Sequence, residues 1–486
     1  MSECENESTL RRTINWKQGL LIALGVPILI LPSIGYSASY LWAFSIALWG
    51  MSVIQGFLQN TAFAEMVTAY PNASGLAGCA QEVFTDRDSK SKYDRGKFIG
   101  GFCAWSYWFA WTPVVAIFTM TIGTYLQGFV PALSDVNSLA LNLIIGVIII
   151  AAMIVIGARG LSGGAVIGLI LALITLVPLV IILVAPFITG DFQISNVTSS
   201  WFPEGWNWNG LDLAVFFGLM GLAQWSACAW ETAAVYGPEY KNPSSDVPKA
   251  LFSCGIICLI LYLLTQTSVV GTLGVEGVLN APLDPLYPLA LMTFGDIGST
   301  VLLILLIGAM ILIIQTGFLG GSRTLYSMAL EGNLPKAFIK TNKKGMPVRA
   351  MLAVGIFNIF LILIGNPVAV LAASSIGYAI AVSIALMAYV KSKRDPELKK
   401  LERPFKAPRG WTYLAAVMVF YELVLLVPGL IYLNSLDYGS ISTIVGAVVL
   451  LAFIPIWILT QKMNKNELKL GAKKPKEGED EVKDAS

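Results

Sequence analysis

The sequence predicts an all-α polytopic membrane protein with about twelve transmembrane helices. Hydrophobic residues make up 56% of the chain and charged residues only 13%, whereas a soluble domain carries about 25% charged residues. Apolar stretches long enough to cross a bilayer, which takes roughly 20 residues, recur along most of the chain. Basic residues are confined to alternate gaps between these stretches, a pattern typical of multi-pass membrane proteins.

The apolar stretches define the expected spans, which are numbered in chain order. After the last span the chain is charged and poor in aromatic residues, so we expect residues 462–486 to be disordered. The spans are expected at residues 18–35, 41–69, 98–128, 138–157, 162–186, 213–236, 250–272, 298–320, 350–364, 367–390, 411–433 and 440–461.

The positions of the basic residues predict the orientation of the chain. Because basic loops stay in the cytoplasm, we expect both termini to be cytoplasmic and the number of crossings to be even. With no disulfide framework and no cleavable signal peptide, the expected location is the plasma (inner) membrane of a bacterium or archaeon. All 32 Lys and Arg residues can be placed on one side, in clusters up to Lys17, over Arg87–Lys97, at Arg159, at Lys241 and Lys249, and over Arg323–Arg349, Lys391–Arg409 and Lys462–Lys483.

The residue types argue against several classes of function. The chain contains no His, which removes the commonest general base and the commonest metal ligand. Its six Cys residues show no metal-ligand spacing, so we expect no metal site and no cofactor. No nucleophile constellation indicates an enzyme, and no basic face outside the cytoplasmic loops indicates binding of nucleic acid.

The first span contains signs of a broken helix. Gly25, Val26 and Pro27 lie near its middle; proline removes an amide donor and clashes with the preceding turn, while glycine permits unusual dihedral angles. Non-helical backbone at this depth is tolerated only where it lines a cavity or is buried in protein. A proline kink that only adjusts packing is the alternative interpretation of this span taken alone.

The sixth span carries a second candidate break. Trp225 and Trp230 flank the four small residues Ser226–Ala229, and Glu231 follows them. Small residues alone favour close helix packing, but an ionisable residue inside a membrane is costly and usually faces a cavity. Interrupted helices at matching positions of two five-helix halves indicate the midplane substrate site of a transporter.

Five groups of motifs resemble those of the amino acid–polyamine–organocation transporter family. The resemblance covers roughly residues 16–410, and the motifs occur in the family's order, which is far more specific than any one of them. They are Phe63–Val67 with Tyr70–Gly75, Trp105–Trp108, Pro238–Pro243 with Val247–Ala250, Ser322–Ala329 with Gly332–Pro335, and Arg403–Pro408.

The resemblance implies the five-plus-five inverted-repeat fold of the LeuT type, with discontinuous helices one and six and two extra helices. It also implies a secondary active transporter, a permease or antiporter, that moves an amino acid or a related amine by alternating access. The expected parts are a cytoplasmic N-terminus (1–17), two five-helix repeats (18–186 and 213–390), helices eleven and twelve (411–461) and the cytoplasmic tail (462–486).

In this family the substrate lies between the broken helices one and six. The closest local match is to the arginine–agmatine exchangers, which implies that Trp225 is a gate over the bound substrate and that Glu231 and Tyr107 form an outer latch. Tyr378 in span ten is a further candidate for the latch. The candidate substrate-binding residues are Gly25, Val26, Pro27, Ile28, Leu29, Trp225, Ser226, Ala229 and Gly317.

Two positions depart from the family pattern. The break usually reads Gly-Ser-Gly, but here Pro27 cannot donate an amide to a substrate carboxylate, so Ile28 and Leu29 are left for this role. Gly317 falls, by spacing, where the exchangers have a Trp that stacks on a guanidinium group. We therefore expect a substrate other than arginine and a pocket with room for a bulkier or less charged side chain.

The sequence leaves the energy coupling open between exchange, H⁺ and Na⁺. Proton-coupled relatives have a Lys in span five, where this chain offers only Thr175 near mid-depth, which argues against that mechanism. Glu65 and Glu231 are other candidate proton carriers. The alternative functions are an amine, polyamine or precursor–product exchanger and a non-transporting sensor on the same fold. The lipid bilayer is the expected partner, and the oligomeric state is not predicted.

Overall fold

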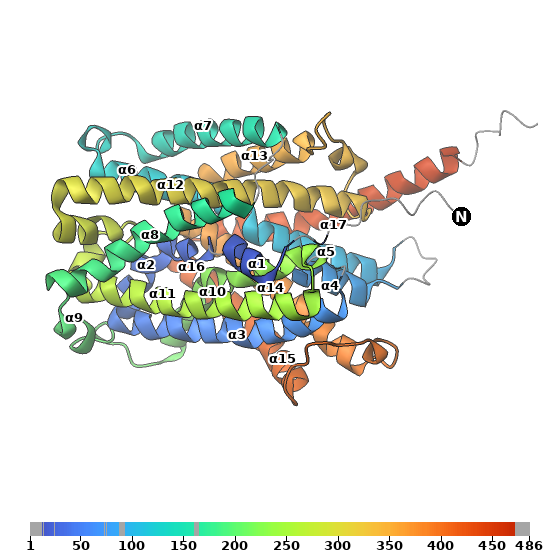
Figure 1. The fold of residues 1–486 in the computed structure, drawn as a ribbon, viewed down its shortest axis with the longest axis horizontal. Coiled ribbons are helices and arrows are strands. Elements are labelled where there is room, and N and C mark those ends of the chain that lie inside the picture. Colours follow the sequence, from blue (N-terminus) through green and yellow to red (C-terminus); the bar gives the residue numbers. More distant parts are fainter. Residues whose placement is uncertain are drawn as a thin grey trace, which may run out of the picture.

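The computed structural model describes residues 12, 14–23, 25–71, 73, 75–86, 93–159 and 165–471. Over these residues the fold is helical, and most long helices run along one common direction (Figure 1). Within the described part of the chain, nine helices are long and apolar enough to cross a membrane. Each of the twelve expected spans coincides with helical structure, and the first of the nine joins expected spans one and two.

The first half of the bundle holds expected spans one to five. Span one is divided between three short elements, and span three between two. The elements are α1 (Trp16–Ala23), η1 (Val26–Ser33), α2 (Ile34–Leu41), α3 (Ser45–Ala69), α4 (Gly75–Phe84), α5 (Arg95–Trp111), α6 (Val114–Phe129), α7 (Ser138–Ala158) and α8 (Ala165–Thr189).

The second half holds the remaining spans, after the short helix α9 (Ile194–Thr198). Span six is divided between α10 and a 3-10 segment, and span eleven contains a π-helical segment. The elements are α10 (Gly210–Ala227), η4 (Ala229–Glu239), α11 (Pro243–Asn280), α12 (Leu286–Leu330), α13 (Val348–Ile362), α14 (Pro367–Arg394), α15 (Trp411–Phe420), η7 (Tyr421–Leu426), α16 (Val427–Asp437) and α17 (Ile441–Gly471).

The helix contacts repeat when the chain is shifted by five spans. α8 of span five packs on α12 of span eight, and α14 of span ten packs correspondingly on α5 of span three. α1 of span one packs on α11 of span seven, and α10 of span six packs correspondingly on α3 of span two. The contacts α3–α11 and α7–α13 each join two spans that are themselves five apart, so the shift exchanges the two partners of each contact. This pattern is the one expected of two five-helix repeats, to which α15 to α17 are added as two further spans.

Both expected helix breaks are present. α1 ends at Ala23, and η1 continues span one as eight residues of 3-10 helix with Pro27 in its first turn. α10 ends at Ala227, and η4 continues span six as eleven residues of 3-10 helix. Such segments rarely exceed 3–4 residues, and long ones mark hinges or strained positions.

The segment before α1 forms backbone hydrogen bonds with the end of η4. The Ile14 amide donates to the Glu239 carbonyl at 3.1 Å, and the Lys241 amide donates to the Ile14 carbonyl at 2.8 Å. The entrance to α1 therefore lies beside the exit from η4, at the end of the bundle that carries basic residues.

The structure differs from the expected elements in three places. α12 extends from Leu286 to Leu330, but Gly295 has a positive φ of 64° and divides it; the part after Gly295 begins close to the expected residue 298 and continues beyond the expected end at residue 320. Residues 462–471, expected to be disordered, continue α17 as helix, while 472–486 lie outside the described residues. Span three has an unexpected interruption at Thr112 and Pro113, where proline cannot donate the helical hydrogen bond.

Candidate functional site

The two broken spans touch each other in the middle of the bundle. The Ser226 hydroxyl, in the last turn of α10, donates to the Leu29 carbonyl in η1 at 2.8 Å. The Tyr262 hydroxyl of α11 lies 2.9 Å from the carbonyls of both Val26 and Ser226; it has one proton and donates to one of them at a time. Because their backbones leave the α-helical pattern, these carbonyls need such partners when they are buried.

The remaining candidates in the breaks lie in the same buried layer. Pro27 and Ile28 are buried in η1, where the Ile28 amide donates to the Gly25 carbonyl at 3.3 Å. Ala229 is fully buried at the start of η4. These residues are therefore placed beside the contact between Ser226 and Leu29, although no hydrogen bond assigns them a role in binding.

Trp225 is held by the end of α5. Its side chain is fully buried, its indole donates to the Ala110 carbonyl at 2.7 Å, and its ring lies 5.3 Å from that of Trp111. Trp111 is the last residue of α5, immediately before the interruption of span three. Sequence reasoning missed Trp111, although its spacing of four residues from Tyr107 places both on one helix face.

Glu231 is buried and bonds to Tyr378. The Tyr378 hydroxyl of α14 donates to Glu231 Oε2, whereas the Tyr107 hydroxyl has no hydrogen-bond partner among the described residues. The ring of Trp111 lies 5.6 Å from that of Tyr378 and 6.1 Å from that of Tyr107. Tyr378 is therefore the hydrogen-bonded partner of Glu231 in this conformation, and the Tyr107 hydroxyl faces the same carboxyl without forming a hydrogen bond of good geometry.

The position of Glu231 along span six bears on where a latch would close. Along span six Glu231 follows Trp225, on the side that leads to Lys241 and the N-terminal segment. That end of the bundle carries the basic residues. The pair Glu231–Tyr378 thus lies between Trp225 and the end of the bundle that carries Lys241 and the N-terminal segment. The expected latch on the outer side stays a prediction, because it depends on which side of the membrane this end faces.

The residue at position 317 is enclosed more tightly than we expected. A Cβ atom at Gly317 of α12 would lie 3.2 Å from two carbon atoms of Val114 and 3.7 Å from the Trp111 carbonyl oxygen. A Cβ atom at Gly25 would lie 3.4 Å from Ile313, also of α12. α12 therefore approaches both η1 and the interruption in span three, and the start of α6 takes up the space beside Gly317.

Several buried polar atoms around this site lack a hydrogen-bond partner in the described part of the chain. Buried polar groups are usually paired, so these atoms are the ones that a polar ligand or water can satisfy. Four lie on span three and one on η4: Ser106 Oγ, Tyr107 Oη, Trp111 Nε1, Thr112 Oγ1 and Glu231 Oε1.

Glu65 has a structural environment that differs from that of Glu231. Its carboxylate accepts from Lys393 Nζ at 2.6 Å, from Arg403 at 3.3 Å, from the Tyr389 hydroxyl at 2.9 Å and from the Ala407 amide at 3.0 Å. Two cations and two neutral donors hold it as a carboxylate. Glu65 therefore fastens α3 to α14 and to the following loop, and is poorly suited to carry a proton.

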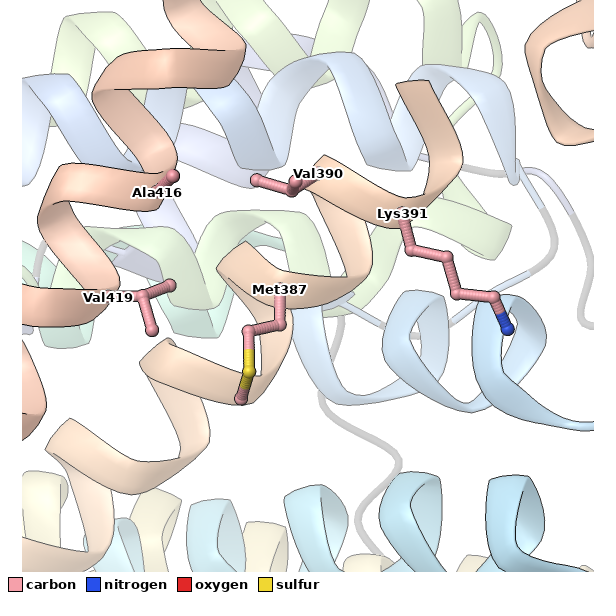
Figure 2. A pocket seen from close by; sticks show the side chains of 5 residues that line it. All are labelled: Met387, Val390, Lys391, Ala416 and Val419. Carbon is pink, nitrogen blue, oxygen red and sulfur yellow. The ribbon is translucent and has the colours of Figure 1, made fainter. Parts of the chain in front are cut away.

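Other chemistry is not supported in the described residues. No group of three or more His, Cys, Asp or Glu could hold a metal there. The five Cys residues in this part of the chain are buried and free, and Cys4 and the side chain of Thr175 lie outside it. The groove in Figure 2 lies between α14 and α15, far along the chain from either break, and Lys391 points away from its apolar lining toward the Val83 carbonyl.

Comparison with known proteins extends over nearly the whole chain. It is 23% identical to the D-serine/D-alanine/glycine transporter of Escherichia coli K12 over 86% of this chain and 88% of the relative. An uncharacterised transporter of Legionella pneumophila is 24% identical over 82% of this chain and 86% of its own length. An uncharacterised amino acid permease of Bacillus subtilis is 27% identical over 71% and 75%, respectively.

The family model for amino acid permeases matches residues 14–454, from the segment before α1 into α17. The match contains both broken spans and all the candidate site residues named above. The chain therefore belongs to the amino acid permease family and is a multi-pass membrane transporter of amino acids rather than an enzyme.

Proposed function

We propose that the chain binds a small neutral amino acid between η1 and η4 and moves it by alternating access. The observation that carries this proposal is the contact between the broken spans through Ser226 and Leu29. The N-terminal end of η4 suits the substrate carboxylate, because free amides and the helix dipole favour an anion. η1 contributes less to this role, because Pro27 has no amide proton and the Ile28 amide already donates to the Gly25 carbonyl. The carbonyl ends of α1 and α10 suit its ammonium group.

The structure and the comparisons both favour a small and neutral side chain. The Trp111–Trp225 pair fills the site with aromatic surface, and a Cβ atom at Gly317 would already be in tight contact with Val114. Relatives in Escherichia coli are named as transporters of D-serine, D-alanine and glycine. A guanidinium or polyamine substrate would need an acidic partner, and the carboxyl of η4, Glu231, is bonded to Tyr378.

The proposed gate consists of Trp225 and Trp111, and the proposed latch consists of Glu231 and Tyr378. With the basic end of the bundle in the cytoplasm, Trp225 closes the outer side of the site and the latch closes the cytoplasmic side. Both termini are then cytoplasmic, and the location is the plasma membrane. The distribution of Lys and Arg supports this orientation.

Uptake into liposomes that contain the purified protein tests the proposal. Glycine, both enantiomers of alanine and serine, arginine, agmatine and ethylamine are offered as labelled substrates, with empty liposomes as the control. We expect uptake of the small amino acids and none of the amines. Uptake of amines alone would overturn the substrate class, and no uptake of any amino acid would overturn the transport proposal for these substrates.

A further inference from the structure

A second buried carboxyl lies outside the two repeats. Glu422 is in η7, the π-helical segment between α15 and α16, and none of its surface is exposed. π-helical turns inside α-helices often occur at functional sites. An ionisable side chain within a membrane span is costly and calls for a functional explanation.

Three neutral donors surround one oxygen of Glu422. Gln59 and Gln224 each donate to Oε1 at 2.6 Å, and Gln55 donates to it at 3.2 Å. The Tyr421 hydroxyl donates to Gln55 Oε1 at 3.2 Å, which fixes the orientation of that amide. The donors come from α3 and α10, so Glu422 joins the extra spans to both repeats.

The other half of this cluster consists of acceptors without donors. Glu422 Oε2, Gln59 Oε1 and Gln224 Oε1 have no hydrogen-bond partner among the described residues, and no cation of that part of the chain forms an ion pair with Glu422. An ionised carboxylate buried without a cation is expensive and is usually neutralised. The cluster therefore lacks a positive charge and a donor.

We propose that Glu422 Oε2 is a proton-binding site linked to the break in span six. Binding forms an O–H bond at Oε2, changes the charge of the carboxyl from −1 to 0 and converts an acceptor into a donor. A proton fits better than a metal ion, because three N–H groups already direct positive partial charge at Oε1 and leave few oxygens to complete a metal coordination shell.

The link to the substrate site runs through Gln224. This residue immediately precedes Trp225 and Ser226 in the last turn of α10. α16 and α10 approach each other closely here, because a Cβ atom at Gly218 would lie 2.5 Å from the Gly429 carbonyl oxygen. A change of charge at Glu422 is thus transmitted to the last turn of α10, and proton binding and substrate binding are linked reciprocally.

The ionisable groups around Glu422 are few. Tyr421 belongs to the same π-helical segment, Cys228 follows α10, and Glu231 lies in η4. The side chains that α3 and α10 direct at the carboxyl, Gln55, Gln59 and Gln224, are neutral amides. Glu231 is therefore the one other acid in this set, and its contribution must be separated experimentally.

Infrared difference spectroscopy tests the proton site without any need for transport. Spectra of the purified full chain are recorded while the pH is stepped, for the wild type, Glu422→Gln, Glu231→Gln and the exposed control Glu276→Gln. We expect the titrating C=O band of one protonated carboxyl to disappear in Glu422→Gln and to persist in Glu276→Gln. A spectrum of Glu422→Gln that keeps every titrating carboxyl band would overturn the proposal.

A second variant covers the case in which Glu422→Gln does not fold. Gln224→Met keeps the carboxyl and removes one of its donors, so the frequency of the same C=O band is expected to shift; an unchanged band overturns the assignment.

The link between proton binding and substrate binding rests on the proposed transport function and is measured as substrate affinity against pH. We expect the pH dependence to flatten in Glu422→Gln, and an unchanged pH profile would refute the link even if the proton site is confirmed.

Discussion

The Ser226 hydroxyl donates a hydrogen bond to the Leu29 carbonyl, although the two residues are 197 positions apart in the chain. One belongs to span six of the second repeat and the other to span one of the first. The bond can form only while α10 and η1 are in contact. It therefore stabilises this conformation of the site relative to any conformation in which the broken spans separate.

Ser226→Ala should weaken this conformation by about 1 kcal/mol, the usual net contribution of a hydrogen bond. Substrate affinity, measured by calorimetry on the purified protein, is expected to change by about fivefold. Ser322→Ala is the matched control, because its buried hydroxyl bonds only to the Phe318 carbonyl of its own helix, at 2.7 Å. Equal effects of the two substitutions on affinity would contradict the role of Ser226.

Trp225→Phe keeps an aromatic ring against Trp111 but removes the donor to the Ala110 carbonyl. We expect the rate of uptake to fall about tenfold, which corresponds to about 1.4 kcal/mol, while the amount of folded protein changes little. Alanine is the less informative substitution, because removing a buried Trp side chain costs about 3–5 kcal/mol of stability.

Trp105→Phe is the control for this substitution. Trp105 also donates to a backbone carbonyl, that of Val449, at 2.8 Å, but it does so at the contact of α5 with α17. We expect uptake by Trp105→Phe to stay within about twofold of the wild type. If both variants lose the same fraction of uptake, Trp225 acts through packing and not as a gate.

Tyr378→Phe and Tyr107→Phe distinguish the two candidate latch residues. Tyr378 donates to Glu231, whereas the Tyr107 hydroxyl has no partner in the described residues. Leaving a buried hydrogen-bonding group without its partner costs about 1–3 kcal/mol, so Tyr378→Phe is expected to change uptake kinetics by about fivefold or more. A larger effect of Tyr107→Phe, measured in the same liposomes, would transfer the latch to Tyr107.

The sequence predicts the broken spans well because their causes are local. Gly25 and Pro27 act on their own backbone, and Glu231 is visible as an acid in an apolar stretch. Trp111 was missed because it lies in the middle of the expected span 98–128, where a large apolar side chain is typical of ordinary packing. Its role depends on the interruption at Pro113 and on contact with Trp225, and these are tertiary features.

Glu422 was also missed, and for a related reason. The chain from 411 to 433 reads as an ordinary apolar span with one acid, and the motifs that indicate the family end near residue 410. The three donors are far away in the sequence, at positions 55, 59 and 224. Only the packing of α10 against both α3 and η7 brings them to the carboxyl.

Glu65→Gln should destabilise the fold by about 3 kcal/mol. The substitution removes a buried charge that binds both Lys393 and Arg403, and breaking one partner of a buried pair leaves uncompensated charge. Glu397→Gln is the control, because its pair with Lys400 is exposed and should contribute less than about 1 kcal/mol. Thermal unfolding of both variants in detergent provides the measurement, and equal melting temperatures would contradict the structural role of Glu65.

Asp284 should make stability depend on pH. This carboxyl lies in the loop between α11 and α12, where burial raises its pKa from 3.8 to about 6. Between these pH values the folded chain therefore binds more protons than the unfolded chain. The stabilising contribution of the protonated Asp284 is complete below about pH 4 and is lost as the pH rises through about 6.

Asp284→Asn stays neutral, so its melting temperature should exceed that of the wild type at pH 8 and should vary less between pH 4 and 6. Asp296→Asn is the control: this exposed carboxyl directly follows the break at Gly295 within α12, and the variant should follow the wild-type curve. A wild-type pH dependence in Asp284→Asn would show that another group causes it.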